Sequence, residues 1–217
     1  KDMNKSNNYT FEITEESLLK LNEISQTMEG STFHKHTHIL YDIRTELGET
    51  PITYLEIGSF AGGSISLIAS HRYPTNCFTL DLGEPINPEV VQRNVANFKN
   101  ELSTFKYFQG NSQDINMVNH IKGEINEVDF LFIDGDHTTN GVLNDFYNYV
   151  GLVKSGGYIA FDDYLDFQYS PEVHGAVNDI VSKLNPEEYD IIGALTYDLL
   201  KDFTDFTANN IFLLKKK

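Results

Sequence analysis

Two short apolar segments of the sequence end in clusters of acidic residues. VDFLFID (128–134) runs directly into Gly135, Asp136 and His137, and GYIAFDD (157–163) closes on two aspartates. If the two segments are neighbouring strands of a sheet, their ends lie about 4.8 Å apart and up to four carboxylates converge. Such carboxylates cannot all remain ionised without a counter-charge, so either their pKa values rise or a cation binds between them.

This arrangement predicts a site for a hard divalent cation, because carboxylate oxygens suit Mg²⁺ first and Mn²⁺ next, whereas zinc would require cysteine or more histidine. His137 adds a side chain of the type that accepts protons near neutral pH, and the carboxylate of Asp136 is its rival for that role. The alternative is structural: the aspartates cap helices or face water, and His137 binds a backbone carbonyl group.

A second group of chemistry-bearing residues precedes these clusters. The segment EIGSFAGGS (56–64) passes from an apolar run through glycines into a helical pattern, and glycine permits positive φ and close approach of a ligand to the backbone. The spacing departs from GxGxxG, so the dinucleotide fingerprint is poorly met. Asp81 ends the next run about 20 residues further on, where a carboxylate can accept hydrogen bonds from ribose hydroxyls.

A third run leads into GNSQD (110–114), whose small and amide side chains could meet the edge of an adenine ring. Here the structural alternative is that Asn111 or Ser112 caps the following helix.

The elements that position these residues alternate between strands and helices. This alternation predicts an α/β fold with a doubly wound, mostly parallel sheet and an antiparallel C-terminal strand, in which ligands bind at the carboxyl ends of the strands. The expected strands are 52–57, 77–82, 105–110, 128–134 and 157–163, followed by a hairpin of 188–195 and 209–216 with a long loop. The expected helices are 14–29, one that carries Ile39 to Leu47, 88–99, one from Thr139 that the turn at 154–157 ends, and 172–184.

Composition narrows the function classes. The chain has 217 residues, with 16 basic against 32 acidic side chains and a net charge of −16, which argues against binding to nucleic acid or an anionic membrane surface. No run of 18 apolar residues and no secretory leader is present, so we expect a soluble, cytoplasmic protein. We expect a single domain of a helical cap (1–50) and a core (51–217); since residue 1 is lysine, it could be cut from a longer chain.

Taken together, EIGSFAGGS, Asp81, GNSQD and Asp134 resemble the class I S-adenosylmethionine (SAM)-dependent O-methyltransferases, which have a Rossmann-like fold. The resemblance is strongest to the catechol type and to the macrocin, cephalosporin-hydroxylase and rhamnosyl O-methyltransferase groups. It covers residues 52–165, over half of the chain. Gly58 and Gly62 are four residues apart, unlike the commoner GxGxG turn of the superfamily, but the catechol type shares this spacing.

The resemblance implies SAM as cofactor and assigns its contacts. Gly58, Phe60 and Ser64 would meet the methionine end, Asp81 the ribose, and Ser112 and Gln113 the adenine, while Glu56 would support the loop from below. The complete implied set is Glu56, Gly58, Ser59, Phe60, Ser64, Asp81, Leu82, Ser112, Gln113 and Asp134.

The resemblance also implies that Asp134, Asp162 and Asp163 bind Mg²⁺ or Mn²⁺. The catechol type has Asp-Asn where this chain has Asp162-Asp163, and it places a lysine base where this chain has His137. Sugar-modifying relatives use a histidine there, and others use the carboxylate equivalent to Asp136. We therefore expect His137 to be the base and keep Asp136 as the alternative.

For the acceptor, the resemblance implies that the segment before the first strand covers the site, so His34 or His36 would touch cofactor or acceptor, and Tyr164 would form another wall. The i, i+2, i+4 spacing of His34, His36 and His38 disfavours a shared metal site on a helix. We expect O-methylation of a sugar, glycan or glycosylated small molecule with adjacent hydroxyls. A catechol-like phenol, a nicotinamide-dependent oxidoreductase and a non-catalytic binding domain are the alternatives, and the oligomeric state, including a homodimer, stays open.

Overall fold

The computed structural model describes residues 12–30, 35–195 and 211–217. Its sheet has the order β3-β2-β1-β4-β5-β7-β6. The strands are β1 (Ile52–Ile57), β2 (Thr75–Asp81), β3 (Thr104–Gln109), β4 (Val128–Ile133), β5 (Val153–Phe161), β6 (Tyr189–Leu195) and β7 (Ile211–Lys216). The helices are α1 (Glu15–Thr27), α2 (Ile39–Glu46), α3 (Gly63–Ala69), α4 (Pro88–Phe98), α5 (Ile115–Glu124), α6 (Thr139–Tyr149) and α7 (Pro171–Lys183), with 3₁₀ turns η1 (Lys35–His38) and η2 (Val150–Leu152).

The predicted strand pairing is confirmed. Strands β1 to β5 are parallel, and β7 runs antiparallel to both β5 and β6. The strands that end before the two acidic clusters are direct neighbours, with Ile133 paired to Phe161. The expected connection between the last two strands falls on residues 196–210, outside the described part of the chain.

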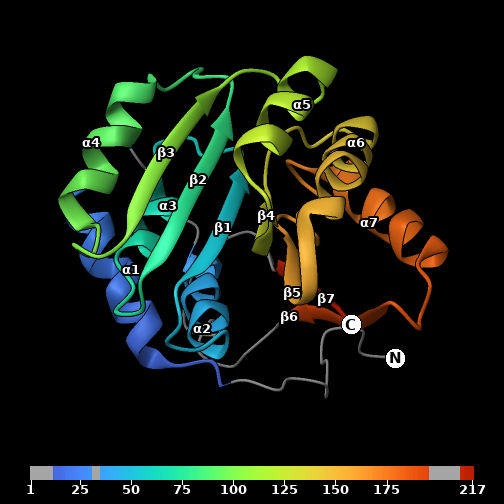
Figure 1. Ribbon diagram of the computed structural model, residues 1–217, viewed down its shortest axis with the longest axis horizontal. Helices are drawn as coiled ribbons and strands as arrows, with labels where there is room; N and C mark the ends of the chain where they lie inside the picture. The colour runs from blue at the N-terminus through green and yellow to red at the C-terminus, as the bar shows by residue number, and fades with distance from the viewer. Residues whose placement is uncertain (1–11, 31–34, 196–210) are drawn as a thin grey trace.

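Helices cover both faces of the sheet (Figure 1), and the alternation of side chains along β4 shows why. Phe130 and Phe132 face a cluster formed with α2, α3 and α4, whereas Leu131 and Ile133 face a cluster formed with α5, α6 and α7. Because β4 is buried on both faces, it reads as a continuous apolar run, as expected for the centre of a doubly wound sheet.

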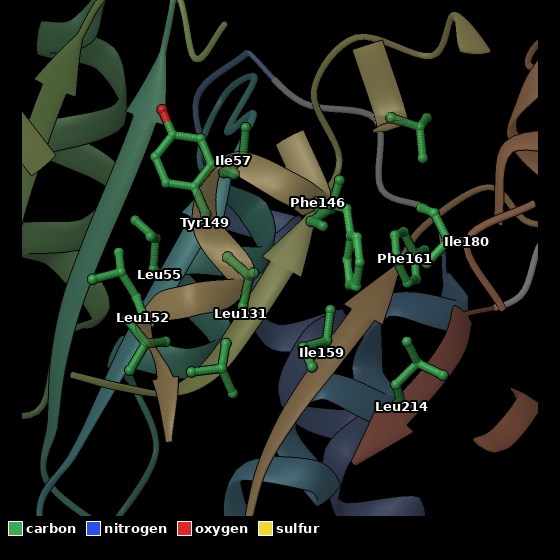
Figure 2. Close-up of a cluster of buried hydrophobic side chains, with 14 of the residues drawn as sticks. Leu55, Ile57, Leu131, Phe146, Tyr149, Leu152, Ile159, Phe161, Ile180 and Leu214 are labelled. Atoms are coloured by element: carbon green, nitrogen blue, oxygen red, sulfur yellow. The ribbon is translucent and has the colours of Figure 1, made fainter. Parts of the chain in front are cut away.

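The second of these clusters supports the strand ends that carry the acidic residues. Figure 2 shows Phe146 of α6 and Ile180 of α7 packed beside Phe161 of β5 and Leu214 of β7. The rings of Phe146 and Phe161 lie 5.8 Å apart between centroids. Residue 161 directly precedes the Asp162-Asp163 pair, so this core fixes where that pair leaves the sheet.

The expectation that the N-terminal helices cap the site is only partly met. Helix α1 packs its Leu21 and Ile24 against Tyr41 of α2 and Leu67 of α3, as an outer layer on one face of the sheet. A buried network joins α1 to α2, in which Ser17 Oγ donates to Asp42 Oδ2 at 2.7 Å and lies against His38 Nδ1. The apolar residues of α1 and α2 pack toward the sheet and not toward the site. Of the described N-terminal residues, those of η1 reach the site.

The start of β5 differs most from the predicted strand boundaries. The segment 154–157 was expected to form a turn before the strand, but β5 already begins at Val153, which pairs with Val128. A register irregularity between Val128 and Phe130 accommodates the extra residues. Among the described residues, no helix is both long and apolar enough to cross a membrane.

Candidate active site

A cavity of about 710 Å³ lies at the carboxyl ends of β1 to β5. This volume is in the range of small-molecule sites. Most of the residues predicted for cofactor, metal and base line it: Gly58, Ser59, Phe60, Ser64, Asp81, Leu82, Ser112, Gln113, Asp134, Asp136, His137, Asp162 and Asp163. Glu56, His36 and Tyr164 were also predicted as site residues but are not among its lining residues.

The glycine turn after β1 requires glycine at its first position. Gly58 has φ +84°, and a Cβ atom there would overlap the carbonyl oxygen of Asp134. The Gly58 amide donates to Leu80 O of the neighbouring strand at 2.8 Å. The turn then passes through Phe60, a non-glycine residue at φ +47°, and Gly62 at φ +93° into α3. At Gly58 the cavity is therefore lined by backbone atoms alone.

Asp81 at the end of β2 has a fixed carboxylate. Its Oδ2 accepts from the Ser59 amide at 2.9 Å and its Oδ1 from the Gly83 amide at 2.7 Å. The hydroxyl of Tyr107 also donates to Oδ1, at 3.2 Å. Since each carboxylate oxygen has two acceptor sites, Asp81 can still accept one hydrogen bond from a ligand in the cavity, at Oδ2.

Ser112 and Gln113 follow β3, line the cavity and are held by α6. Ser112 Oγ donates to Asp145 Oδ1 at 2.6 Å, and the Tyr149 hydroxyl donates to Ser112 O at 2.7 Å. Gln113 Nε2 donates to Asp136 Oδ2 at 3.0 Å. Asp145 is fully buried and its Oδ2 has no hydrogen-bond partner among the described residues, and burial raises its pKa to about 6.

Three side chains gather at the acidic end of the cavity. One ligand atom from each of Asp134, His137 and Asp163 lies within 4.8 Å of the others. His137 Nε2 is 3.1 Å from Asp163 Oδ2 and 3.3 Å from Asp134 Oδ1, and His137 Nδ1 is 3.2 Å from Ser170 Oγ. Two carboxylates and an imidazole nitrogen at such separations are a donor set that fits a divalent cation.

Electrostatics support the same conclusion. Burial, and then the neighbouring Asp162 and Asp163, hold the pKa of Asp134 well above its usual range. Burial, followed by Asp162, raises the pKa of Asp163 to about 8. These carboxyl groups therefore resist ionisation unless a positive charge joins them.

Asp162 is engaged differently from its neighbours. Its Oδ1 lies 2.6 Å from His36 Nε2 and accepts from the Asp163 amide at 2.9 Å. His36 is buried in η1 and contacts Asp162 without lining the cavity. The adjacent Thr37 does line the cavity. His34, the other candidate from this segment, lies outside the described residues.

Asp136 points away from the acidic cluster. Its Oδ1 accepts from the Thr138 amide at 2.9 Å, and its Oδ2 accepts from Gln113. The hydrogen bond from the Thr138 backbone is the main reason that the pKa of Asp136 falls below its ordinary value. A carboxylate stabilised in this way is a weak proton acceptor.

Tyr164 is not a wall of the cavity, which corrects the prediction. Its side chain is buried, its ring packs on His174 and Phe212, and its hydroxyl donates to Asn178 Oδ1 at 2.7 Å. The physical reason is the backbone of Asp163, whose φ of +61° turns the chain so that the next side chain enters the core.

Glu56 lies in β1, before the glycine turn, and is not among the residues that line the cavity. It is fully buried and accepts from the Tyr54 hydroxyl at 2.7 Å, and burial raises its pKa to about 8. Its role beneath the loop stays a prediction.

Sequence reasoning missed Asp145 and Ser170. The signal for Asp145 was available, since it lies between Val142, Phe146 and Tyr149 on the apolar face of a helix, where an acidic residue requires a reason. Ser170 gave no comparable signal, because a serine before Pro171 reads as an ordinary N-cap.

The sheet order and the antiparallel β7 are those of the class I SAM-dependent methyltransferase fold. A family model described as a methyltransferase domain matches residues 55–164, and the chain belongs to this family. This finding sets aside the nicotinamide-dependent alternative.

The chain is also similar to individual proteins. The uncharacterized protein R132 of Acanthamoeba polyphaga mimivirus is 35% identical over 206 residues, which cover 90% of this chain and 93% of that relative. An O-methyltransferase from Bacillus cereus in complex with SAH has a TM-score of 0.63 at 18% identity, covering 93% of this chain and 90% of the other.

A second structural neighbour is the methyltransferase MycE of the mycinamycin biosynthetic pathway, in complex with Mg, SAH and mycinamycin VI. Its TM-score is 0.61 at 18% identity, covering 92% of this chain and 53% of the other. At such identities the two solved structures show a shared fold.

Proposed function

We propose that the chain is a divalent-metal-dependent O-methyltransferase that acts on a hydroxyl of a sugar, a glycan or a glycosylated small molecule. The observation that carries the proposal is the continuity of one cavity, which runs from the glycine turn and Asp81 to Asp134, His137 and Asp163. A methyl donor and a hydroxyl acceptor have to lie in line for transfer, and such positioning supplies much of the catalysis.

The cofactor half of the cavity is the part that contains the glycine turn, Asp81, Ser112 and Gln113. There we assign the ribose of SAM to Asp81 and the adenine to Ser112 and Gln113. The methionine end is assigned to Gly58, Ser59, Phe60 and Ser64, with Leu82 beside the nucleoside. Two backbone amides already orient the Asp81 carboxylate, so little reorganisation is required when the ribose binds.

The acidic half of the cavity is the part that contains Asp134, His137 and Asp163. There Asp134 and Asp163 would hold the cation, with Asp162 next to them. A bound Mg²⁺ or Mn²⁺ would supply charge that stabilises an ionised acceptor hydroxyl. The raised pKa values of Asp134 and Asp163 support this assignment, because a cation would compensate the burial and the mutual repulsion that raise them.

We assign the base to His137 rather than Asp136. His137 lines the cavity with its Nε2 toward the acidic cluster. Asp136 instead accepts hydrogen bonds from Thr138 and Gln113, and the first of these lowers its pKa and makes it a weaker base. In this assignment His137 takes the acceptor proton, and Asp136 holds Gln113 against the adenine.

A neutral acceptor such as a sugar suits the charge of the chain, which is −16 overall and concentrated in part at this cavity. The complex of MycE with Mg, SAH and mycinamycin VI adds weight to the choice of a glycosylated small molecule. A phenolic acceptor remains a member of the test panel below.

Calorimetry with SAH is the first experiment, and binding that fails at high micromolar concentration would contradict the proposal. Methylated product is then sought by mass spectrometry with a panel of sugars, glycosides and phenols, in MgCl₂ and again in EDTA. We expect product only with the metal, and Asp163→Ala should abolish it while SAH still binds. The matched control is Asp179→Ala on the exposed side of α7, which should leave both unchanged.

A further inference from the structure

Helix α6 carries an acidic residue on the face that it turns to the core. Asp145 is fully buried, as are Val142 and Tyr149, three and four residues away on the same face. Its Oδ1 accepts from Ser112 Oγ at 2.6 Å, and its Oδ2 has no hydrogen-bond partner among the described residues. Burial of a carboxylate is costly unless its hydrogen bonds are made, so packing alone would favour an apolar residue at this position.

The contact with Asp145 determines which way the Ser112 hydroxyl points. An ionised carboxylate can only accept hydrogen bonds, and Asp145 is ionised above its pKa of about 6. The hydroxyl proton of Ser112 therefore points at Asp145, which does not line the cavity, whereas Ser112 does. The hydroxyl oxygen keeps lone pairs for another partner, so toward a ligand it is a hydrogen-bond acceptor and not a donor.

The two purine bases that differ at position 6 would meet this oxygen differently. Adenine carries an exocyclic amino group there, which donates hydrogen bonds, while its ring nitrogens accept them. Hypoxanthine has a carbonyl oxygen in place of that amino group. An acceptor fixed at Ser112 pairs with the amino group and opposes the carbonyl oxygen, and a site built to bind an N–H group rejects an analogue that lacks it.

We propose that Asp145 is a positioning residue for cofactor recognition, which holds the Ser112 hydroxyl as an acceptor and so makes the cavity select a 6-aminopurine over a 6-oxopurine. This inference rests on the proposed function, because it assumes that Ser112 meets the adenine of SAM. It gives the buried carboxylate a reason that packing does not, since the hydrogen bond to Ser112 is what joins Asp145 to the cavity.

A second contact from α6 provides a matched control. The Tyr149 hydroxyl donates to Ser112 O at 2.7 Å, so Asp145 and Tyr149 hold the same residue from the same helix. Tyr149 binds the backbone carbonyl group, however, and has no influence on the direction of the hydroxyl proton. If α6 only supported the loop after β3, loss of either contact would weaken the binding of both purines alike.

The test is calorimetry of the full chain at pH 8 with SAH and with its deaminated analogue, S-inosylhomocysteine. The quantity measured is the ratio of the two Kd values, and we expect the wild type to bind the analogue about 10- to 100-fold more weakly. Asp145→Leu and Asp145→Ala both free the Ser112 hydroxyl to rotate, so the ratio should fall to within about threefold. Tyr149→Phe should keep the wild-type ratio.

The two substitutions of Asp145 differ in volume but share the lack of an acceptor, so a packing effect would separate them and the proposed effect would not. Ser112→Ala removes the hydroxyl from the cavity wall without disturbing the core. It should lower the ratio to the same extent, and addition of Asp145→Leu should lower it no further, because the two residues act as one unit. Ser112→Ala decides the question on its own if neither Asp145 variant folds.

Equal affinity of the wild type for the two ligands would overturn the inference. A wild-type ratio in Asp145→Leu, Asp145→Ala or Ser112→Ala would overturn it as well, and would place the discrimination on another group of the cavity. Binding of SAH with a ratio that ignores these substitutions refutes only the inference. Absence of SAH binding to the wild type refutes the proposed function itself.

Discussion

Asp81 in the cofactor half of the cavity is surrounded by hydrogen-bond donors, whereas Asp134 and Asp163 in the acidic half are surrounded by other acids. Both oxygens of Asp81 accept from backbone amides. In contrast, burial and neighbouring carboxylates raise the pKa values of Asp134 and Asp163. Both regions stand at the carboxyl ends of parallel strands of one sheet, so the sheet alone does not determine how a carboxylate there behaves.

The difference is that the chain itself stabilises the ionised carboxylate in one half, whereas under the proposed function a bound cation would do so in the other. Backbone donors stabilise the ionised form of an acid, and like charges stabilise its neutral form. The two halves touch at Gly58, which lies against the backbone of Asp134.

Gly58→Ala should remove the contrast altogether by damaging both halves. A Cβ atom at Gly58 would overlap the carbonyl oxygen of Asp134, and φ +84° strains any other residue. We expect calorimetry to detect binding of neither SAH nor a divalent cation. Gly151→Ala is the control, because an added Cβ there meets nothing within 4 Å; SAH affinity within tenfold of wild type in Gly58→Ala would contradict the prediction.

Asp81→Ala should separate the halves. Hydrogen bonds to a charged group contribute about 1.5–3 kcal/mol, so the Kd for SAH should rise about 10- to 100-fold. The Kd for Mg²⁺ should not change, because Asp81 is outside the acidic cluster. Calorimetric titrations with each ligand measure both values, and a parallel loss of cation binding would show that the two halves are not independent.

Asp145 belongs to the cofactor half, but its pKa is raised like those of the acidic half. The free energy of unfolding should therefore depend on pH through this residue. Its pKa is raised from 3.8 to about 6 by burial, so the folded state binds more protons than the unfolded state between those values. Stability contributed by the protonated group is therefore lost as pH rises from about 4 to about 6, by up to ~3 kcal/mol, and is constant above.

Urea unfolding of the wild type and of Asp145→Asn across pH 4 to 7 measures this effect as the difference between the two stability curves. We expect the difference to change only within the stated window. A difference that is constant with pH would show that Asp145 is ionised throughout.

Tyr164→Phe should have the smallest effect, because the residue lies behind the acidic half rather than in its wall. Loss of the hydrogen bond to Asn178 should reduce the free energy of unfolding by about 1 kcal/mol. The KM for an acceptor should be unchanged, as measured by initial rates. A raised KM at equal stability would return Tyr164 to the acceptor site.

Much of this site was predictable because strand ends are predictable. Asp81, Asp134 and Asp162 each follow an apolar run, and parallel strands bring their carboxyl ends to one edge. Ser170 was not predictable, since its partner depends on how α7 packs against the sheet. The fate of Tyr164 depends on positive φ at Asp163, a conformation that an aspartate adopts too seldom to be expected from sequence.

The same limit applies to the N-terminal segment. Its helices were correctly predicted from periodicity, but periodicity does not state which surface they cover. Leu21 and Ile24 place α1 over α2 and α3, and the buried His38, with its pKa lowered to about 4 by burial, serves the contact between α1 and α2 rather than a ligand.

The position of β7 reverses the order in which the sheet can be completed. Strand β6 precedes β7 in the chain, yet its partner in the sheet is β7, which in turn pairs with β5. A growing chain therefore exposes β6 with no neighbour to receive it until residues 211–216 have been made. Since β7 is the last strand of the sheet to be made, we expect the edge beyond β5 to be the last part of the sheet to assemble on a growing chain.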